Sequence, residues 1–315
     1  MRKLILPFII IFIGIFFWWT NAVAPVNKSD THKEIFVIVK GAGIKAIAKN
    51  LKEQKLIKDE TAFYVLVKKL GIENKIQAGS FRLSPSQSSE QIAQALTKGS
   101  LDVWVTIPEG KRAEEIADLL EKNIPSYKSE WRGQLIANEG YLFPDTYLFP
   151  IDSSIESILS IMKSNFTHRY ATLSNNKANM TQNELVTIAS LIEREAKHDT
   201  DRPLIASVIY NRLDNGMPLQ IDATIQYILG YQPSEQSWWK RHLSLDDLSI
   251  SSAYNTYKNT GLPPTPIANP GIKSLEAAMN PANTDYLFYI TDKNGTNHYA
   301  KTNTEHEKNI EKYGL

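Results

Sequence analysis

The sequence predicts an α+β fold that follows an N-terminal transmembrane helix. An uncharged apolar run occupies Leu4–Ala24, short strand-then-helix units follow it, and longer amphipathic helices then alternate with proline-rich loops. The 315 residues suffice for two folded units beyond a targeting segment. We therefore expect a small α/β domain at residues 34–105 and a larger mixed α+β domain at residues 106–315.

The first element is predicted to be a membrane anchor at residues 1–24. Arg2 and Lys3 precede the apolar run, which as a helix would be about 30 Å long and could cross a bilayer. If the basic residues stay inside, the rest of the chain lies outside the membrane. The polar, aperiodic residues 25–33 would then form a short tether.

A cleaved secretory signal is the alternative for this segment. Ala22-Val23-Ala24 has the small-x-small form of a signal-peptidase site. Pro25 directly after that site should hinder cleavage, and Trp18 and Trp19 stand where aromatic side chains favour a membrane interface. These flanks favour the anchor, and both interpretations export the folded part of the chain.

The composition excludes several classes of function. The chain has 35 Lys and Arg against 34 Asp and Glu, so it lacks the positive field of a general nucleic-acid binder. It has no cysteine, which excludes disulfides, thiolate nucleophiles and iron–sulfur clusters. Its 6 histidines are scattered without HExxH-type spacing, so we expect neither a metal nor a cofactor.

Residues 34–120 are predicted to contain repeated strand-to-helix units. Glu34–Val39 predicts a strand and Gly43–Leu51 a helix, and the Ile-Ala-x-x-Leu face of that helix recurs at Ile92–Leu96 and Ile116–Leu120. The unequal spacing of the recurrences argues against a solenoid. We expect each apolar face to belong to the core and the strands to form a sheet covered by helices.

A helix that bears two acids carries the strongest chemical signal. Thr181–Glu184 has the form of a capping box, so the helix should run from Thr181 to about Lys197. A carboxyl group at the edge of its apolar stripe resists ionisation and can act as a general acid. Glu193 and Glu195 flank that stripe but point about 160° apart, so they cannot act on one bond as a pair. An exposed ion pair between Glu193 and Lys197 is the plainer alternative.

Polar groups downstream add candidate ligand contacts. Arg202–Leu213 predicts a second amphipathic helix, and Leu219–Thr224 then predicts an extended segment. Alternation in this extended segment would place Gln220, Asp222 and Thr224 on one side.

Two stretches rich in aromatic residues and proline frame these elements. Glu139–Pro150 is too dense in proline for a helix and too apolar for a linker, so it should pack against the larger domain. Tyr254–Tyr257 and Gly261–Gly271 form a turn-rich stretch with aromatic rings and amides. Such rings and amides suit a sugar, which needs flat apolar faces beside directional hydrogen bonds. A proline-rich surface loop is the alternative.

Several motifs together resemble a known family. They are Tyr141–Tyr147, Ala189–Ala196, Ala206–Leu213, Met217–Thr224, Tyr254–Tyr257, and Gly261–Pro264 with Ile267–Gly271. In these motifs, in the N-terminal anchor and at Ala78–Leu83, the chain is similar to the membrane-bound endolytic murein transglycosylases, the YceG-like family. The similarity extends over nearly the whole chain.

The resemblance implies a bacterial enzyme that cleaves peptidoglycan glycan strands internally and leaves a 1,6-anhydro-N-acetylmuramic acid end. It implies a LysM-like fold for residues 34–105 and a catalytic domain at residues 106–315. The implied location is the cytoplasmic membrane, with the N-terminus inside and the catalytic domain outside, which is periplasmic in a Gram-negative cell. The expected partners are glycan strands, the membrane through residues 4–24, and peptidoglycan synthases.

The resemblance places the catalytic glutamate at Glu193. This residue would protonate the leaving oxygen and then, as a base, take the C6-hydroxyl proton as that oxygen closes on C1. The expected substrate contacts are Gln220, Asp222, Thr224, Tyr254, Asn255, Thr256 and Tyr257. Further candidates are Glu195, Tyr141, Asp145 and Asn269. Trp238 and Trp239 lie in a stretch that does not match the family and could be a sugar platform or core.

Other functions stay open at this point. A lysozyme-like hydrolase would use Asp222 or Glu195 to activate water opposite Glu193, and it would leave reducing ends, which are one water heavier than anhydro ends. A non-catalytic peptidoglycan-binding scaffold would cleave nothing. A metalloenzyme is disfavoured by the histidine spacing.

Overall fold

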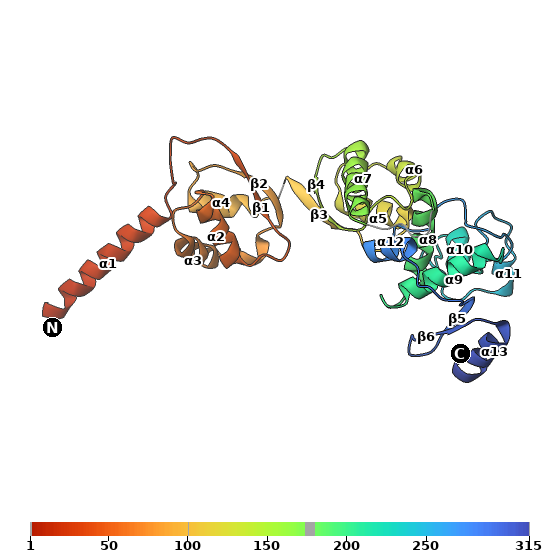
Figure 1. Ribbon diagram of the computed structural model, residues 1–315. Coiled ribbons are helices and arrows are strands. Elements are labelled where there is room, and N and C mark those ends of the chain that lie inside the picture. Colours follow the sequence, from red (N-terminus) through yellow and green to blue (C-terminus); the bar gives the residue numbers. More distant parts are fainter. Residues whose placement is uncertain (1, 100, 174–179, 315) are drawn as a thin grey trace. The chain divides into compact units, whose positions relative to one another are not determined.

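The computed structural model describes residues 2–99, 101–173 and 180–314, with side chains from residue 12 onward in these ranges. The chain divides into two compact units (Figure 1). Unit 1 is Met1–Val105 with Tyr147–Asp152, and unit 2 is Thr106–Thr146 with Ser153–Leu315. Helices and small two-stranded sheets make up the units, so the predicted mixed α+β class is confirmed.

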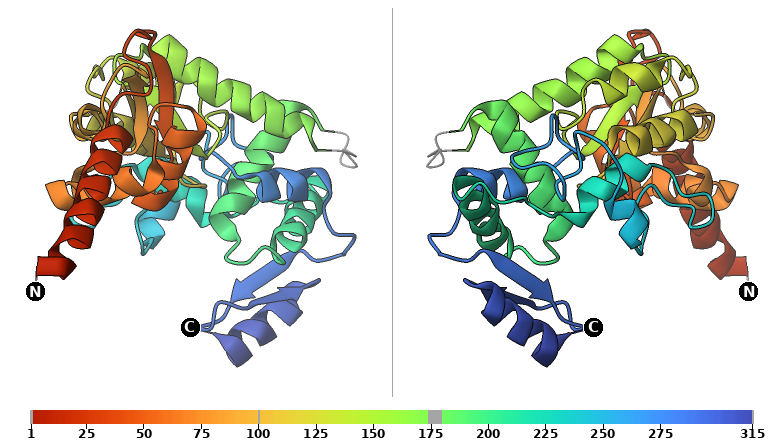
Figure 2. Two further views of the ribbon diagram at one scale, coloured as in Figure 1. Left: turned by 90° about the vertical axis from the view of Figure 1, so that its left-hand side faces the viewer. Right: turned by 90° about the vertical axis from the view of Figure 1, so that its right-hand side faces the viewer.

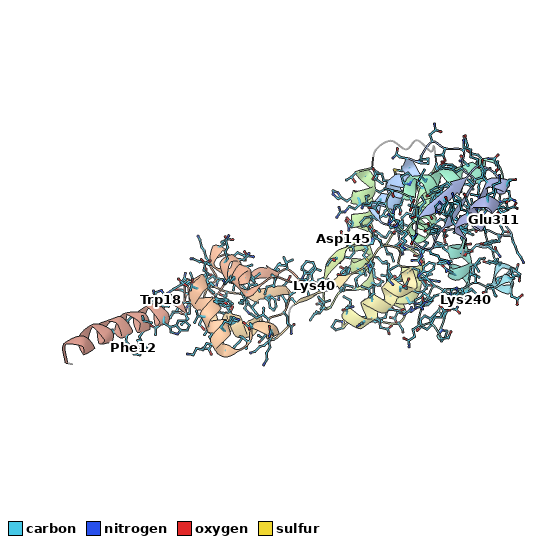
Figure 3. All side chains as sticks on the ribbon, turned by 90° about the horizontal axis from the view of Figure 1, so that it is seen from below. Phe12, Trp18, Lys40, Asp145, Lys240 and Glu311 are labelled. Carbon is cyan, nitrogen blue, oxygen red and sulfur yellow. The ribbon has the colours of Figure 1, made fainter. Side chains whose placement is uncertain are left out.

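The first helix, α1, spans Arg2–Ala22. Phe12 and Trp18 on this helix are 73% and 48% exposed (Figure 3). Within the described part of the chain, none of the helices has the length and apolarity that a membrane span requires. The side chains of residues 4–11 lie outside the described ones, so the predicted anchor at residues 4–24 stays a prediction.

The core of unit 1 lies between one pair of strands and three helices. β1 and β2 are antiparallel, with Phe36 opposite Phe81, and both rings are buried. Two of the predicted Ile-Ala-x-x-Leu faces, at Ile47–Leu51 and Ile92–Leu96, are buried in this core, and the third, at Ile116–Leu120, is buried in unit 2. The elements are β1 (Glu34–Ile38), α2 (Ile44–Glu53), α3 (Glu60–Leu70), the short 3-10 turn η1 (Glu73–Lys75), β2 (Gly79–Leu83) and α4 (Ser89–Ala95).

The predicted common sheet is wrong. Among the described strands, β3 (Asp102–Thr106) pairs with β4 (Thr146–Pro150) in a separate two-stranded sheet. β4 comes from the aromatic and proline-rich stretch, and its Tyr147 and Phe149 are buried. Local alternation predicts that a strand forms, but the partner of the strand depends on long-range packing.

Unit 2 is mainly helical and ends in a β-hairpin followed by a helix. The hairpin and this last helix form a small lobe beside the other helices of the unit (Figure 2). The elements are α5 (Ala113–Asn123), α6 (Trp131–Ile136), α7 (Ile155–Ala171), α8 (Gln182–Glu195), α9 (Arg202–Asp214), α10 (Asp222–Leu229), α11 (Leu245–Leu248), α12 (Ile272–Met279), β5 (Phe288–Thr291), β6 (Asn297–Ala300) and α13 (Asn303–Tyr313).

Helix α8 runs through the core of unit 2. The predicted capping box is confirmed: Thr181 Oγ1 accepts from the Glu184 N–H at 3.4 Å, and the Glu184 carboxylate accepts from the Thr181 N–H at 2.8 Å. Every residue of Leu185–Ile192 is buried, and α9 and α12 pack against the helix. The acids at the end of α8 are therefore carried on a rigid element.

Candidate functional site

Glu193 faces a set of protein donors at the end of α8. Its side chain is 7% exposed, and one of its oxygens lies 3.4 Å from Arg202 Nη2. The other oxygen accepts from the Gly271 N–H at 3.0 Å and from Ser274 Oγ at 2.7 Å. The alternative of an exposed pair with Lys197 is therefore wrong, because Glu193 is nearly buried and pairs with Arg202.

A second acid, Glu109, lies beside Glu193. A Cβ on Gly271 would be 1.9 Å from Glu109 Oε1, so a larger residue at this position would displace the Glu109 side chain. Burial raises the pKa of Glu109, and the nearby charge of Glu193 raises it further. The sequence around Glu109, Pro-Glu-Gly-Lys, predicts only a turn and does not reveal this contact.

Glu195 faces a cavity of about 320 Å³. Its Oε2 accepts a hydrogen bond from the Tyr289 hydroxyl at 2.7 Å. Burial raises the pKa of Glu195, the charge of Asp222 adds to that rise, and the bonds from Tyr289 and the Ala223 N–H oppose it. This carboxyl group therefore keeps its proton to a higher pH than an ordinary glutamate does.

The cavity brings together four of the predicted site residues. Glu195, Gln220, Asp222 and Tyr257 line it, whereas Glu193 does not. The Tyr257 hydroxyl donates a hydrogen bond to the Asp222 carboxylate. Three further lining residues carry polar groups and were not predicted: Arg212, Tyr289 and His306.

The segment before α10 places Asp222 differently from the prediction. Helix α10 begins at Asp222, where an acidic side chain is favourable beside the helix dipole, and Gln220 has a left-handed φ of 51°. Gln220 and Asp222 line the cavity, whereas Thr224 is buried in the helix. The prediction of three polar groups on one side is wrong, because a turn and a helix replace the expected strand.

Thr256 connects the segments of the cavity wall through buried hydrogen bonds. Its carbonyl oxygen accepts from the Gln220 N–H at 3.0 Å, and its Oγ1 accepts from the Ile221 N–H at 3.0 Å. The hydroxyl of Thr224 lies 3.0 Å from the same Oγ1. Thr224 and Thr256 are both buried, so they orient Gln220 and Asp222 and do not face the cavity.

Asn255 has a similar internal function. It is fully buried, and its side-chain amide donates to the carbonyl oxygens of Leu248 at 3.0 Å and Ile250 at 2.7 Å. Its side-chain oxygen accepts from the Tyr257 N–H at 2.9 Å. These bonds shape the loop that directs Tyr257 toward Asp222.

The other predicted aromatic and acidic candidates do not line the cavity and bond within the protein. The partners are Thr265 for Tyr254, Asn183 for Tyr141, and Asn165 with Arg169 for Asp145.

Comparison with known proteins identifies the family. The model of the YceG-like family matches residues 36–312. This chain belongs to the YceG-like family.

Named relatives and a solved structure agree with this membership. An endolytic murein transglycosylase from Bacillus subtilis is 36% identical over 334 residues, which cover 95% of this chain and 90% of that protein. One from Streptococcus pneumoniae is 30% identical, and the match covers 92% of this chain and 60% of that protein. The crystal structure of a yceG-like protein from Listeria monocytogenes matches with 33% identity and a TM-score of 0.58, over 88% of this chain and 99% of that one.

Asn269 joins a buried acid in this YceG-like chain that the sequence did not single out. Burial raises the pKa of Glu139 to about 8. The Glu139 carboxyl group accepts from the Ala113 N–H at 2.9 Å and from Asn269 Nδ2 at 2.7 Å. Asn269 also accepts from the Leu142 N–H at 2.9 Å. Asn269 and Glu139 therefore connect three segments of unit 2.

The paired tryptophans of this family member are held by charged neighbours. Trp239 Nε1 donates to Glu115 Oε2 at 2.9 Å, and the Arg194 guanidinium lies 3.7 Å from the centre of a Trp239 ring. Trp238 Nε1 donates to Asp118 Oδ2 at 3.1 Å. Both side chains are partly buried and neither lines the Glu195 cavity.

Proposed function

We propose that this chain is an endolytic peptidoglycan lytic transglycosylase and that Glu195 is its general acid. The observation that carries the proposal is the cavity in which Glu195, with its raised pKa, meets Asp222 and Tyr257. Membership of the YceG-like family and the names of the relatives support the substrate class. The expected cut lies between N-acetylmuramic acid and N-acetylglucosamine.

The surroundings of the two glutamates favour Glu195 over the expected Glu193. A general acid needs a proton and access to the leaving oxygen. Both oxygens of Glu193 already accept from protein donors, which are Arg202, Gly271 and Ser274, and its side chain is nearly buried. Glu195 faces a cavity, and burial favours its protonated form. The proposal therefore moves the catalytic function two residues along α8 and gives Glu193 a structural function.

The proposed reaction transfers one proton in each direction. Glu195 donates its proton to the glycosidic oxygen as the bond from that oxygen to C1 breaks, and positive charge develops at C1. The acetamido group of the sugar and the Asp222 carboxylate stabilise that charge. The Glu195 carboxylate then takes the C6-hydroxyl proton while the C6 oxygen bonds to C1. The product carries a 1,6-anhydro ring, and no water is consumed.

Digestion of purified peptidoglycan by the full chain tests this proposal. Mass spectrometry of the released fragments should show anhydro ends, and Glu195→Gln should lower the rate of their formation about 10²–10⁴-fold. The proposal fails if the wild-type chain, folded by circular dichroism, releases no fragments or if Glu195→Gln retains wild-type activity.

A hydrolase is the second candidate, and one observation favours it. Asp222 lines the same cavity as Glu195, so this site holds the two carboxyl groups that a lysozyme-like enzyme uses. The same digestion separates the two reactions, because a hydrolase releases only reducing ends. In that outcome Asp222→Asn should abolish cleavage as completely as Glu195→Gln.

We further propose a membrane-anchored arrangement for the enzyme. Residues 4–24 would anchor the chain in the cytoplasmic membrane, a LysM-like domain at residues 34–105 would follow, and the catalytic domain would act outside the membrane on nascent strands beside peptidoglycan synthases. The basic residues before the apolar run and the exported substrate of the named relatives support this arrangement. Protease digestion of intact spheroplasts should degrade the catalytic domain, and its full protection would contradict the proposed topology.

A further inference from the structure

One cavity residue, His306, comes from the C-terminal lobe. His306 lies near the start of α13 and lines the cavity together with Glu195 and Asp222. Tyr289, on β5 of the same lobe, donates the hydrogen bond to Glu195. Helix α13 packs on β5 and β6 (Figure 2). The lobe therefore contributes directly to the cavity of the proposed enzyme.

Packing alone does not account for a histidine at this position. The ring of His306 stacks on Phe288, with 5.2 Å between the ring centres and 21° between the planes. Such stacking requires only a flat ring. Nδ1 of His306 is buried, and within the described part of the chain it has no hydrogen-bond partner. A buried nitrogen without a partner costs free energy, so a phenylalanine would be the better choice for packing.

The ring is neutral near pH 7. Burial lowers the pKa of His306, and the nearby Arg212 charge lowers it further against a smaller effect of Glu307. Arg212 itself is engaged, because it donates to the carbonyl oxygens of Leu287 at 2.7 Å and Leu219 at 2.6 Å. Because Nδ1 is buried, Nε2 is the ring nitrogen left for a ligand, and in a neutral imidazole it can donate to or accept from the hydroxyl and acetamido groups of an amino sugar.

We propose that His306 contacts the glycan bound beside Glu195, through a hydrogen bond to a hydroxyl or acetamido group of the sugar. The inference rests on the proposed function, because it takes the Glu195 cavity to be the glycan site. It gives the C-terminal lobe a function in substrate binding.

Two substitutions of His306 separate its polar atoms from its ring. His306→Phe keeps a ring that can stack on Phe288 and removes both nitrogens. It should raise KM on purified glycan strands about tenfold, with little change in Tm. His306→Gln keeps a donor and an acceptor without the ring, and its KM should lie between that of the wild type and that of His306→Phe.

His298 offers a matched control in the same lobe. Its ring stacks on the ring of Tyr313, with 3.6 Å between the ring centres, and its Nε2 lies 3.0 Å from Asp292 Oδ2. His298 does not line the cavity. His298→Phe should leave KM unchanged even if it lowers Tm. An equal rise of KM in His298→Phe and His306→Phe would overturn the proposal, because general loosening of the lobe would then explain both.

Further outcomes keep this inference distinct from the proposed function. If wild type cleaves glycan and Glu195→Gln does not, a wild-type KM in His306→Phe overturns only the present inference. If His306→Phe does not fold, His306→Ala replaces it, and a wild-type KM in His306→Ala likewise overturns the inference. If wild type cleaves nothing, the proposed function fails.

In that case the affinity for a glycan tetrasaccharide, measured by calorimetry, tests the His306 contact by itself. Weaker binding by His306→Phe than by wild type supports the contact, and equal or undetectable binding overturns it.

Discussion

The two sides of the end of α8 differ in how they surround a carboxyl group. On one side Glu193 accepts from Arg202, from the Gly271 N–H directly before α12 and from Ser274 of α12, and it lies beside Glu109. On the other side Glu195 accepts from Tyr289 and faces a cavity. Both are partly buried acids on one helix. The partners of a carboxyl group, and its access to a ligand, therefore decide whether it connects elements or does chemistry.

The largest expected effect tests which side carries the reaction. Glu195→Gln should lower the rate of glycan cleavage by about 10²–10⁴-fold, because a positioned general acid contributes roughly that much. Quantified anhydro fragments from purified peptidoglycan provide the measurement. Glu193→Gln is the matched control and should retain more activity per folded molecule. If Glu193→Gln is the inactive variant and its Tm equals that of the wild type, Glu193 and not Glu195 is the general acid.

The next effect concerns the stability that Glu193 provides. Glu193→Ala removes one partner of the Arg202 guanidinium, which is only 10% exposed but keeps its ion pair with Asp199, and it also removes the acceptor of the Gly271 N–H and Ser274 Oγ. The loss of these bonds should destabilise unit 2 by about 1–3 kcal/mol. Urea denaturation followed by circular dichroism measures the loss. Adding Arg202→Met to the same chain should recover part of it. Equal stability of Glu193→Ala and wild type would contradict the structural function assigned to Glu193.

The third prediction concerns Glu139, a buried acid that belongs to neither side of the end of α8. Its pKa is raised from 4.5 to about 8, so the folded state retains a proton that the unfolded chain releases. This contribution to stability is complete below pH 4.5 and is lost as the pH rises to about 8. The slope is about 1.4 kcal/mol per pH unit at most.

Glu139→Gln should flatten this dependence, because glutamine imitates the protonated acid. Urea denaturation at several pH values between 5 and 8 would compare the slopes of the two chains. Identical slopes would show that Glu139 is not the group that retains the proton.

The smallest expected effect lies within the cavity. Tyr257→Phe removes the hydroxyl group that donates to Asp222, and it should lower kcat/KM about three- to tenfold through the loss of one charge-assisted hydrogen bond. Tyr254→Phe removes a hydroxyl that bonds to Thr265 outside the cavity and should have less effect. Steady-state kinetics on purified glycan strands measure both variants. A larger loss in Tyr254→Phe would contradict the position of the cavity.

Much of the fold was predictable where the signal was local. The capping box at Thr181 and the buried faces around Ile47, Ile92 and Ile116 all agree with the structure, because capping and helical periodicity act within a few residues. The partner of β3 and the helix that begins at Asp222 did not follow from such patterns. Strand pairing and the switch from strand to helix depend on contacts between segments that are distant in sequence.

The candidate site was predictable only in part for the same reason. Gln220, Asp222 and Tyr257 reach the cavity, but Thr224, Asn255 and Thr256 from the same motifs are interior. A motif identifies residues that matter without separating those that face a ligand from those that hold the wall. Tyr289 and His306 had no local signal, because only packing of the C-terminal lobe brings them to Glu195.

The α+β class, the family, and the two acids that flank the stripe of α8 follow from the amino-acid sequence alone, because composition, motifs and helical periodicity are properties of short segments. Helical periodicity also implies that these acids point apart. Which of the two acids faces a cavity depends on how distant segments pack. Arg202, Ser274, Tyr289 and Asp222 come from other segments, and the balance of burial, charge and hydrogen bonds that they create exists only once the chain has folded.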